Sequence, residues 1–236
     1  MEDCLEHDRP ETISVEETAT RYLQEIRRVQ PNGPYLLGGH CYGGVLAFEM
    51  ARQLHNQGDT VGLLVVIDAI LPETIIEPTD DDDAKFLLRI AESMKTVSDV
   101  DLSVPFEELR DLPLTEKLNL INKKANCIFS NAELQDFLRH YELFKAHVQS
   151  MRSYVPLCYP HSITLFRALE EIVHDFDNPE WSINDPLLGW GKCSSKPIQF
   201  IDVPGDHFSI FVEPHIQELA KQLRICIDNA ICNLDK

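Results

Sequence analysis

The sequence Gly39-His40-Cys41-Tyr42-Gly43-Gly44 constrains the fold of this chain more than any other segment. It lies between an apolar run at residues 35–37 and a run with helical character at residues 45–54. A strand, a tight turn with glycines two residues on either side of a nucleophile, and a helix together form a nucleophile elbow. We expect the turn to hold Cys41 at strained backbone angles. We also expect both flanking glycines to be required, because a Cβ there would collide with the neighbouring strand and helix.

The residue at the centre of the elbow indicates the chemistry. Such elbows usually carry serine, and here the position is taken by Cys41. A cysteine is a strong nucleophile when its thiol is deprotonated, so it needs a base or a positive field nearby. The helix that starts just after Cys41 supplies part of that field through its N-terminal end. The sequence therefore predicts acyl transfer through a thioester rather than an oxoester.

Alternation of strand-like and helical runs predicts the fold class. The expected strands cover residues 35–38, 61–67, 162–168 and 198–203, and the expected helices cover residues 14–29, 45–54 and the segment from Glu213-Pro214 onward. Ser14 with Glu17 three residues later predicts a capping box at the start of the first helix. This order favours an α/β fold with a mostly parallel sheet and helices on both of its faces.

Residues 80–154 differ from the rest of the chain because helical periodicity appears there without any strand. The periodic runs are residues 84–94, 115–125 and 131–153. Three helices inserted between two strands predict a lid, so we expect a single domain over residues 1–236 with a lid insertion at about residues 73–155. Several apolar lid side chains are candidates to line a substrate channel, with ordinary helix packing as the alternative: Phe86, Leu87, Ile90, Phe137, Tyr141 and Phe144.

Three side chains fall at the carboxyl ends of expected strands, where the chemistry of parallel sheets is usually located. They are Cys41, Asp68 and His207. His207 follows a strand and a Pro-Gly turn, so its imidazole can act as base and then as acid. Asp68 can orient that imidazole and stabilise its charged form. The backbone N–H of Tyr42 is expected to donate to the oxyanion.

Other residues near these positions allow alternatives. Glu170, Glu171 and Asp175 follow the strand at residues 162–168 and compete with Asp68 for the role of the acid. His40 is next to the nucleophile, and we interpret it as a packing or entrance residue. The remaining histidines receive no role from the sequence.

Composition and charge exclude several classes of protein. The formal charge of −18 at pH 7 disfavours nucleic acid and anionic membranes as partners. No stretch reaches the roughly 18–20 apolar residues of a membrane span, and the acidic N-terminus lacks the apolar core of a signal peptide. We therefore expect a cytoplasmic protein. The seven cysteines are scattered without Cys-x-x-Cys spacing, which argues against a disulfide framework and a zinc site.

Four segments resemble the thioesterase domains that end nonribosomal peptide and polyketide synthetases. They are residues 33–44 (GPYLLGGHCYGG), 47–51 (AFEMA), 162–168 (SITLFRA) and 203–209 (VPGDHFS). The resemblance implies an α/β-hydrolase fold and release of an acyl or peptidyl chain from the phosphopantetheine arm of a carrier protein. Release is by water or by an internal nucleophile, giving an acid or a macrocycle, and no metal or organic cofactor is needed. The family pattern places its nucleophile on Cys41, its acid on Asp68 and its base on His207.

The chain departs from the family pattern in two ways. The first is cysteine in place of serine, which keeps the covalent intermediate a reactive thioester and favours difficult or aminolytic release over simple hydrolysis. The second is the early start of the helix at residues 14–29, because family members usually begin with further strands and a Gly-rich turn that supplies a second oxyanion donor. We therefore expect missing N-terminal strands and an unprotected edge on the elbow strand. That edge invites a complementing N-terminal segment or self-association.

Two other functions fit the same sequence. One is a small-molecule esterase or lactonase of this fold, and the other is a catalytically inactive truncated domain with an interaction role. Rapid alkylation of Cys41 at neutral pH would separate a working triad from an inactive domain. Acidic carrier proteins would need a local basic surface, for which Arg27-Arg28 and Lys123-Lys124 are candidates, with solvated helix faces as the alternative.

Overall fold

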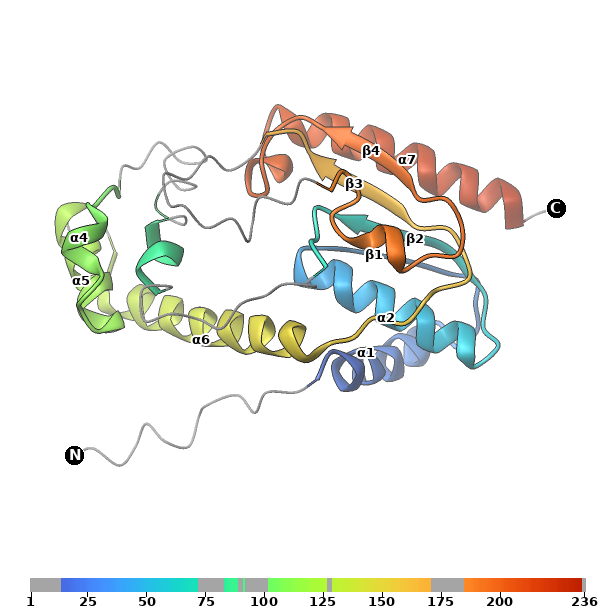
Figure 1. Cartoon of the computed structure of the whole chain (residues 1–236), viewed down its shortest axis with the longest axis horizontal. Helices are drawn as coiled ribbons and strands as arrows, with labels where there is room; N and C mark the ends of the chain where they lie inside the picture. The colour runs from blue at the N-terminus through green and yellow to red at the C-terminus, as the bar shows by residue number, and fades with distance from the viewer. Residues whose placement is uncertain are drawn as a thin grey trace. The chain divides into compact units, whose positions relative to one another are not determined.

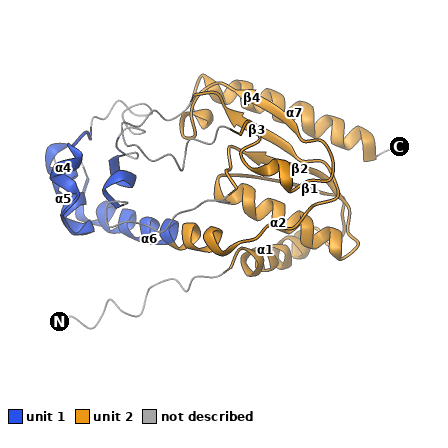
Figure 2. Cartoon of the chain, viewed as in Figure 1, with its two compact units in different colours: residues 1–10, 76–145, 174–177 blue, residues 11–75, 146–173, 178–236 orange. Residues whose placement is uncertain are grey.

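A computed structural model describes residues 14–71, 83–88, 91, 102–126, 129–170 and 185–234. The chain divides into two compact units (Figure 2). The described part of the first unit lies between residues 83 and 145, and the described part of the second covers residues 14–71, 146–170 and 185–234. The expected single domain with a lid at about residues 73–155 stays a prediction.

A parallel sheet forms the centre of the second unit. Among the described residues it has four strands in the order β1-β2-β3-β4, namely β1 (Tyr35–His40), β2 (Val61–Ile67), β3 (Thr164–Ala168) and β4 (Gln199–Val203). Every neighbouring pair is parallel, so the four carboxyl ends lie at one edge of the sheet. The predicted mostly parallel α/β fold is confirmed.

Helices cover both faces of this sheet (Figure 1). The helices α1 (Val15–Val29) and α2 (Tyr42–Asn56) lie on one face, and α7 (His215–Leu234) lies on the other. Successive side chains of a strand point to opposite faces, so each buried strand serves two cores. In β2, Leu64 and Val66 join the core with α1 and α2, whereas Val65 and Ile67 join the core with α7.

The first helix begins where its capping residue predicts. Ser14 is the N-cap of α1, and its Oγ accepts a hydrogen bond of 3.1 Å from the backbone N–H of Glu17. Acidic side chains lie in the first turn and basic ones in the last, which suits the helix dipole. Val15, Ala19 and Leu23, which are spaced four residues apart along one face of the helix, are buried.

Element boundaries differ from the predicted ones at several places. The helix α2 begins at Tyr42, immediately after the nucleophile, because the tight turn leaves no linker between strand and helix. The short helix α4 (Phe106–Leu109) was not predicted, since four residues carry too little periodicity to be recognised. The helix expected at residues 84–94 is confirmed at residues 84–88 and 91, residue 83 is helical as well, and the remainder of the expected range lies outside the described residues.

The first unit has its own core. Besides the helical residues 83–88, it contains α4, α5 (Leu114–Lys124) and the first part of α6 (Asn131–Ser153), which has the predicted bounds. Leu87, Leu109 and Ile121 are among its buried side chains. Asn122 joins α5 to the segment before α6, since its side chain donates to and accepts from the backbone of Phe129. None of the described helices combines the length and apolarity that crossing a membrane requires.

Candidate active site

The chain turns sharply at Cys41 between β1 and α2. The φ and ψ angles of this residue are 52° and −128°, a conformation that side-chain-bearing residues rarely adopt. Such strain costs about 1–3 kcal/mol and is concentrated at functional sites. The turn is fixed from both sides, because the Cys41 N–H donates to the carbonyl of Ile67 and its own carbonyl accepts from the N–H of Gly44. The predicted strained elbow is confirmed.

The glycines of the elbow do not all serve the expected purpose. A Cβ on Gly39 would lie 2.1 Å from the carbonyl oxygen of Gly43, which is a collision with backbone. A Cβ on Gly43 would meet no atom within 4 Å, so the expected collision at that position is wrong. The residue that has no space is instead Gly44, where a Cβ would lie 2.9 Å from that of Ala69. The helix therefore packs closely against the sheet at Gly44, whereas the position of a Cβ on Gly43 faces open space.

Asp68 follows β2 directly and is held by three hydrogen bonds. Its backbone N–H donates to the carbonyl of Phe166 over 2.7 Å, and its φ is 43°. Its Oδ1 accepts from the N–H of Ala168 at 2.9 Å, and its Oδ2 accepts from His207 Nδ1 at 2.8 Å. Burial opposes ionisation of the carboxyl, but the bonds from His207 and Ala168 outweigh it and hold the pKa of Asp68 below its usual value.

His207 lies in a tightly closed loop after β4. The carboxylate of Asp206 accepts from the N–H groups of Phe208 and Ser209, and Ser209 Oγ accepts from the N–H of Asp206. Gly205, with a φ of 96°, reverses the chain before this loop. The loop therefore fixes the position of the imidazole through its own backbone.

The His207 imidazole connects the other two predicted side chains. Its Nδ1 is bonded to Asp68, and the Cys41 side chain is a second neighbour that affects its pKa. Burial alone would lower the pKa of His207, but the bonds to Asp68 and Cys41 and the charges of both raise it to about 10. The structure thus places His207 next to both Cys41 and Asp68 at the carboxyl ends of the strands, with a direct hydrogen bond to Asp68. An imidazolium in this place can stabilise a thiolate.

Tyr42 is the first residue of α2. Its backbone N–H is one of the first four of the helix, which have no partner within the helix. The ring of Tyr42 stacks on that of His147, with centroids 4.2 Å apart and planes inclined by 13°. Its hydroxyl lies 3.4 Å from Ser150 Oγ. The sequence did not single out these contacts, because they join residues more than 100 positions apart. The oxyanion role of Tyr42 stays a prediction.

A buried ionic network supports the elbow helix from behind. Glu49 of α2 is completely buried, and Arg52 donates to both of its carboxylate oxygens over 2.7 Å. Gln53 and Tyr154 donate to the same carboxylate over 2.9 Å each. The network ties α2 to the end of α6, so it fixes the helix whose first turn carries the predicted oxyanion donor.

Of the competing acids, the structure describes Glu170, which is not among the described hydrogen-bonding partners of His207. Glu170 is exposed, and its backbone N–H donates to the carbonyl of Gly205. Glu171 and Asp175 lie outside the described residues. The described partner of His207 Nδ1 is Asp68.

The aromatic candidates for the channel belong to the first unit and contact one another there. Phe86 stacks on Phe144 with centroids 4.2 Å apart and lies 4.9 Å from the ring of Tyr141. Phe137 is partly buried against the same core, Leu87 is buried within it, and Ile90 lies outside the described residues. These contacts fit the alternative of helix packing, and the channel role stays a prediction.

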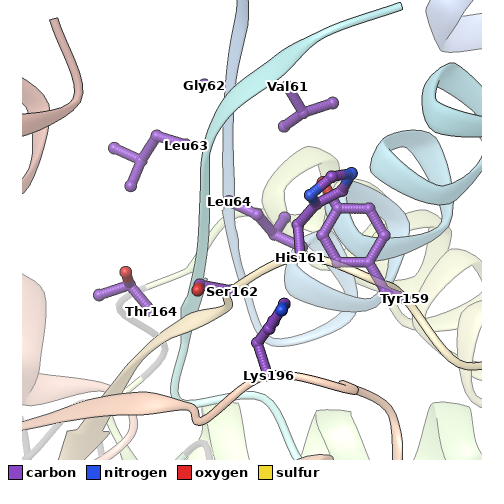
Figure 3. A pocket seen from close by; sticks show the side chains of 9 residues that line it. All are labelled: Val61, Gly62, Leu63, Leu64, Tyr159, His161, Ser162, Thr164 and Lys196. Atoms are coloured by element: carbon purple, nitrogen blue, oxygen red, sulfur yellow. The ribbon is translucent and has the colours of Figure 1, made fainter. Parts of the chain in front are cut away.

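A second group of polar side chains lies at the opposite edge of the sheet. A depression of about 310 Å³ opens at the amino ends of β2 and β3, and Val61, Tyr159, His161, Thr164 and Lys196 are among the residues that line it (Figure 3). Across the described residues, no three His, Cys, Asp or Glu side chains are grouped so that they could hold a metal ion.

The family described as Thioesterase domain matches residues 4–225. Atromentin synthetase of Tapinella panuoides is 28% identical over 215 residues, which are 89% of this chain and 22% of that protein. Nonribosomal peptide synthetase btyA of Aspergillus terreus is 27% identical over 95% of this chain and 24% of that protein. The chain thus spans about a quarter of the length of these curated relatives.

One relative carries a different description. A protein of Paxillus involutus named inactive atromentin synthetase is 28% identical over 93% of this chain and 23% of its own length. Relatives that are 27–28% identical to this chain therefore include proteins with and without the word inactive in their names.

Solved structures give the same picture of the fold. A four-domain nonribosomal peptide synthetase bound to AMP and glycine superposes with a TM-score of 0.71 and 28% identity, over 89% of this chain and 16% of that one. The NocB thioesterase domain, solved as a covalent complex with a fluorophosphonate analogue of nocardicin G, has a TM-score of 0.57 and 23% identity, over 94% and 78% of the two chains. The second likeness concerns the fold alone.

Proposed function

Because the chain belongs to the family of thioesterase domains, we propose that it releases an acyl or peptidyl chain from the phosphopantetheine arm of a carrier protein through a covalent intermediate on Cys41. The observation that carries this proposal is the hydrogen bond between Asp68 and His207, whose imidazole also interacts with the Cys41 side chain. Support also comes from relatives that are themselves nonribosomal peptide synthetases. The product is an acid when water attacks and a macrocycle when an internal nucleophile attacks.

Formation of the covalent intermediate uses all three side chains. The Cys41 thiolate, paired with the His207 imidazolium, attacks the carbonyl carbon of the carrier thioester and forms a new carbon–sulfur bond. The carbonyl oxygen of the thioester becomes negative and accepts a hydrogen bond from the backbone N–H of Tyr42. Loss of one such donor typically costs about 3–4 kcal/mol of transition-state stabilisation. The intermediate collapses, and the phosphopantetheine sulfur leaves with the proton from His207. Asp68 holds the imidazole in the required orientation and stabilises its charged form.

Release reverses the same proton movements. Neutral His207 takes a proton from water or from a hydroxyl or amine of the bound chain as that group attacks the acyl carbon. The bond to Cys41 breaks, and the thiolate is again paired with the imidazolium. Loading exchanges one thioester for another, so it is nearly isoenergetic and leaves an intermediate that remains reactive toward amines. We therefore propose that cysteine favours difficult or aminolytic release.

The carrier protein is the proposed partner, and its docking surface must be local because the chain has a formal charge of −18. The candidate basic pairs are partly neutralised. Arg27 is paired with Asp59, Arg28 with Glu25 and Lys124 with Glu108. These contacts support the alternative that both basic pairs are ordinary helix faces.

Turnover of a defined carrier substrate tests the proposal. The purified chain is incubated with a carrier protein bearing a simple acyl-phosphopantetheine, and the mass of the carrier is followed over time. We expect loss of the acyl group with the native chain and none above background with Cys41→Ala. Equal release by both would contradict the proposal. Faster turnover of a free ester than of the carrier-bound one would favour an esterase, and folded protein without either activity would favour an inactive domain with an interaction role.

A further inference from the structure

His40 lies between the nucleophile and the base. It is the last residue of β1, adjacent to Cys41 in the chain, and it is level with Ile67 on the side of the sheet that α7 covers. Its ring lies against the His207 ring, with centroids 4.4 Å apart and planes inclined by 35°. The ring of Phe211 also contacts it, edge to face, with centroids 4.8 Å apart. The His40 ring thus contacts two aromatic rings of residues that follow β4.

A hydrogen bond joins His40 to the backbone of the base. Its Nε2 lies 3.1 Å from the carbonyl oxygen of His207. A carbonyl oxygen only accepts, so Nε2 carries the hydrogen. Burial and the nearby charge of His207 lower the pKa of His40 to about 4, so its ring is neutral near pH 7. A neutral ring can lie against an imidazolium without repelling it.

The topology explains why such a contact matters. In the described sheet, β1 and β4 are the two outer strands, with β2 and β3 between them. The nucleophile follows the first and the base follows the last, so His207 must reach across the ends of two strands. The Nδ1 bond to Asp68 fixes one side of the imidazole. The bond from His40 fixes the backbone of the same residue directly to the strand that carries Cys41.

We propose that His40 is a positioning residue that holds the His207 imidazole at Cys41 by a hydrogen bond to its backbone carbonyl and by contact with its ring. This inference rests on the proposed function, because it assigns His40 a part in the same reaction. It replaces the interpretation of His40 as a packing or entrance residue. A packing residue would contribute volume, whereas a positioning residue must contribute both the donor at Nε2 and the flat ring.

Three substitutions separate these contributions. His40→Gln keeps a donor near the position of Nε2 and loses the ring, His40→Phe keeps the ring and loses the donor, and His40→Ala loses both. The readout is the rate at which iodoacetamide alkylates Cys41, followed by peptide mass from pH 5 to pH 9, together with thermal unfolding of each variant. His55→Ala is the matched control, since His55 lies beside the depression at the opposite edge of the sheet.

We expect His40→Ala to slow alkylation at pH 7 by up to about 10²-fold, the size of effect that small misplacements cause. The increase in alkylation rate with pH should occur at higher pH in this variant than in the native protein, because a displaced His207 no longer pairs with the thiolate. His40→Gln and His40→Phe should each recover part of the loss. In a His207→Ala background, His40→Ala should add nothing further, because its effect passes through His207.

Each contrary result has a defined meaning. The inference fails if His40→Ala alkylates at the native rate, or if its effect persists undiminished in the His207→Ala background. It also fails if all three variants slow alkylation only in proportion to their loss of thermal stability. Failure of the proposed function is separate, because it would appear as native protein whose alkylation depends on His207 and His40 but which removes no acyl group from the carrier.

Discussion

Two pairs of histidines lie at opposite edges of the same sheet, and the pKa of one histidine in each pair is shifted in the opposite direction to that of the other. At the carboxyl ends of the strands, His207 contacts His40 and is bonded to Asp68, and its pKa is raised to about 10. At the amino ends, His161 Nε2 lies 3.1 Å from His55 Nδ1. Burial, His55 and Lys196 lower the pKa of His161. The residue type is the same, so the neighbouring charge decides which histidine can act as an acid and base.

The largest expected difference is between the catalytic effects of removing His207 and of removing His161. We expect His207→Ala to lower kcat/KM for the carrier-bound acyl group by about 10⁴-fold or more, as loss of a triad member does in other hydrolases. His161→Ala should stay within about twofold of the native value. Steady-state kinetics on both variants measure the contrast. Similar losses in the two variants would show that the histidine near Cys41 has no special role.

Asp68 is the carboxylate that is bonded to His207 at the carboxyl edge of the sheet. A substitution that removes its charge alone tests how much that charge contributes. Asp68→Asn keeps the size of the side chain but no longer stabilises the imidazolium, and we expect a loss in kcat of about 10³–10⁴-fold. Glu170→Gln is the control at the competing position, and it should leave kcat close to native. A larger loss from Glu170→Gln than from Asp68→Asn would overturn the assignment of the acid.

Gly39 and Gly43 of the elbow allow a crowded position and an open position to be compared within one turn. Gly39→Ala places a Cβ 2.1 Å from a backbone oxygen, so it should destabilise the fold by about 3 kcal/mol or more. Gly43→Ala enters open space in a helix, where alanine is favoured by about 1 kcal/mol. Urea unfolding of the two variants should therefore shift in opposite directions. Equal destabilisation would contradict the described geometry of the elbow.

The pH dependence of stability should also differ between the two edges. The pKa of His207 is raised in the folded state, so its contribution is fully present below the unfolded value of about 6.5 and is lost as pH rises toward 10. The pKa of His161 is lowered, so its contribution has the opposite sign and weakens the fold as pH falls below about 6.5.

The difference in unfolding free energy between native protein and His207→Ala should shrink from pH 6 to pH 10. The unfolding free energy of His161→Ala should rise relative to that of the native protein as pH falls from 7 to 5. A His207 difference that grows with pH would mean that the imidazolium is not stabilised in the fold.

Local patterns in the sequence were sufficient for the parts of the site that depend on neighbouring residues. The strained turn at Cys41 follows from a strand, a glycine turn and a helix in succession, and the strand ends place Asp68 and His207 at the same edge. Local patterns could not distinguish Gly43 from Gly44, because only the approach of Ala69 from another strand end decides which one has no space.

The contacts that the sequence did not predict join distant positions. The bond from His40 spans 167 residues, and the stacking of Tyr42 on His147 depends on where α6 ends. A histidine beside a nucleophile has the same local sequence whether it packs, lines an entrance or positions a base. Its role depends on which backbone carbonyl lies within reach of Nε2, and that is a property of the folded sheet.

The central claim is that Cys41 is the nucleophile, and trapping the acyl-enzyme tests it most directly. The native chain and Cys41→Ala are each mixed with the acyl-loaded carrier, quenched in acid within seconds, and their intact masses are measured. The account predicts an added acyl mass on the native chain, mapped to the peptide containing Cys41 and absent from the variant. An adduct of equal yield on the Cys41→Ala protein, or on a different residue of the native chain, would contradict it.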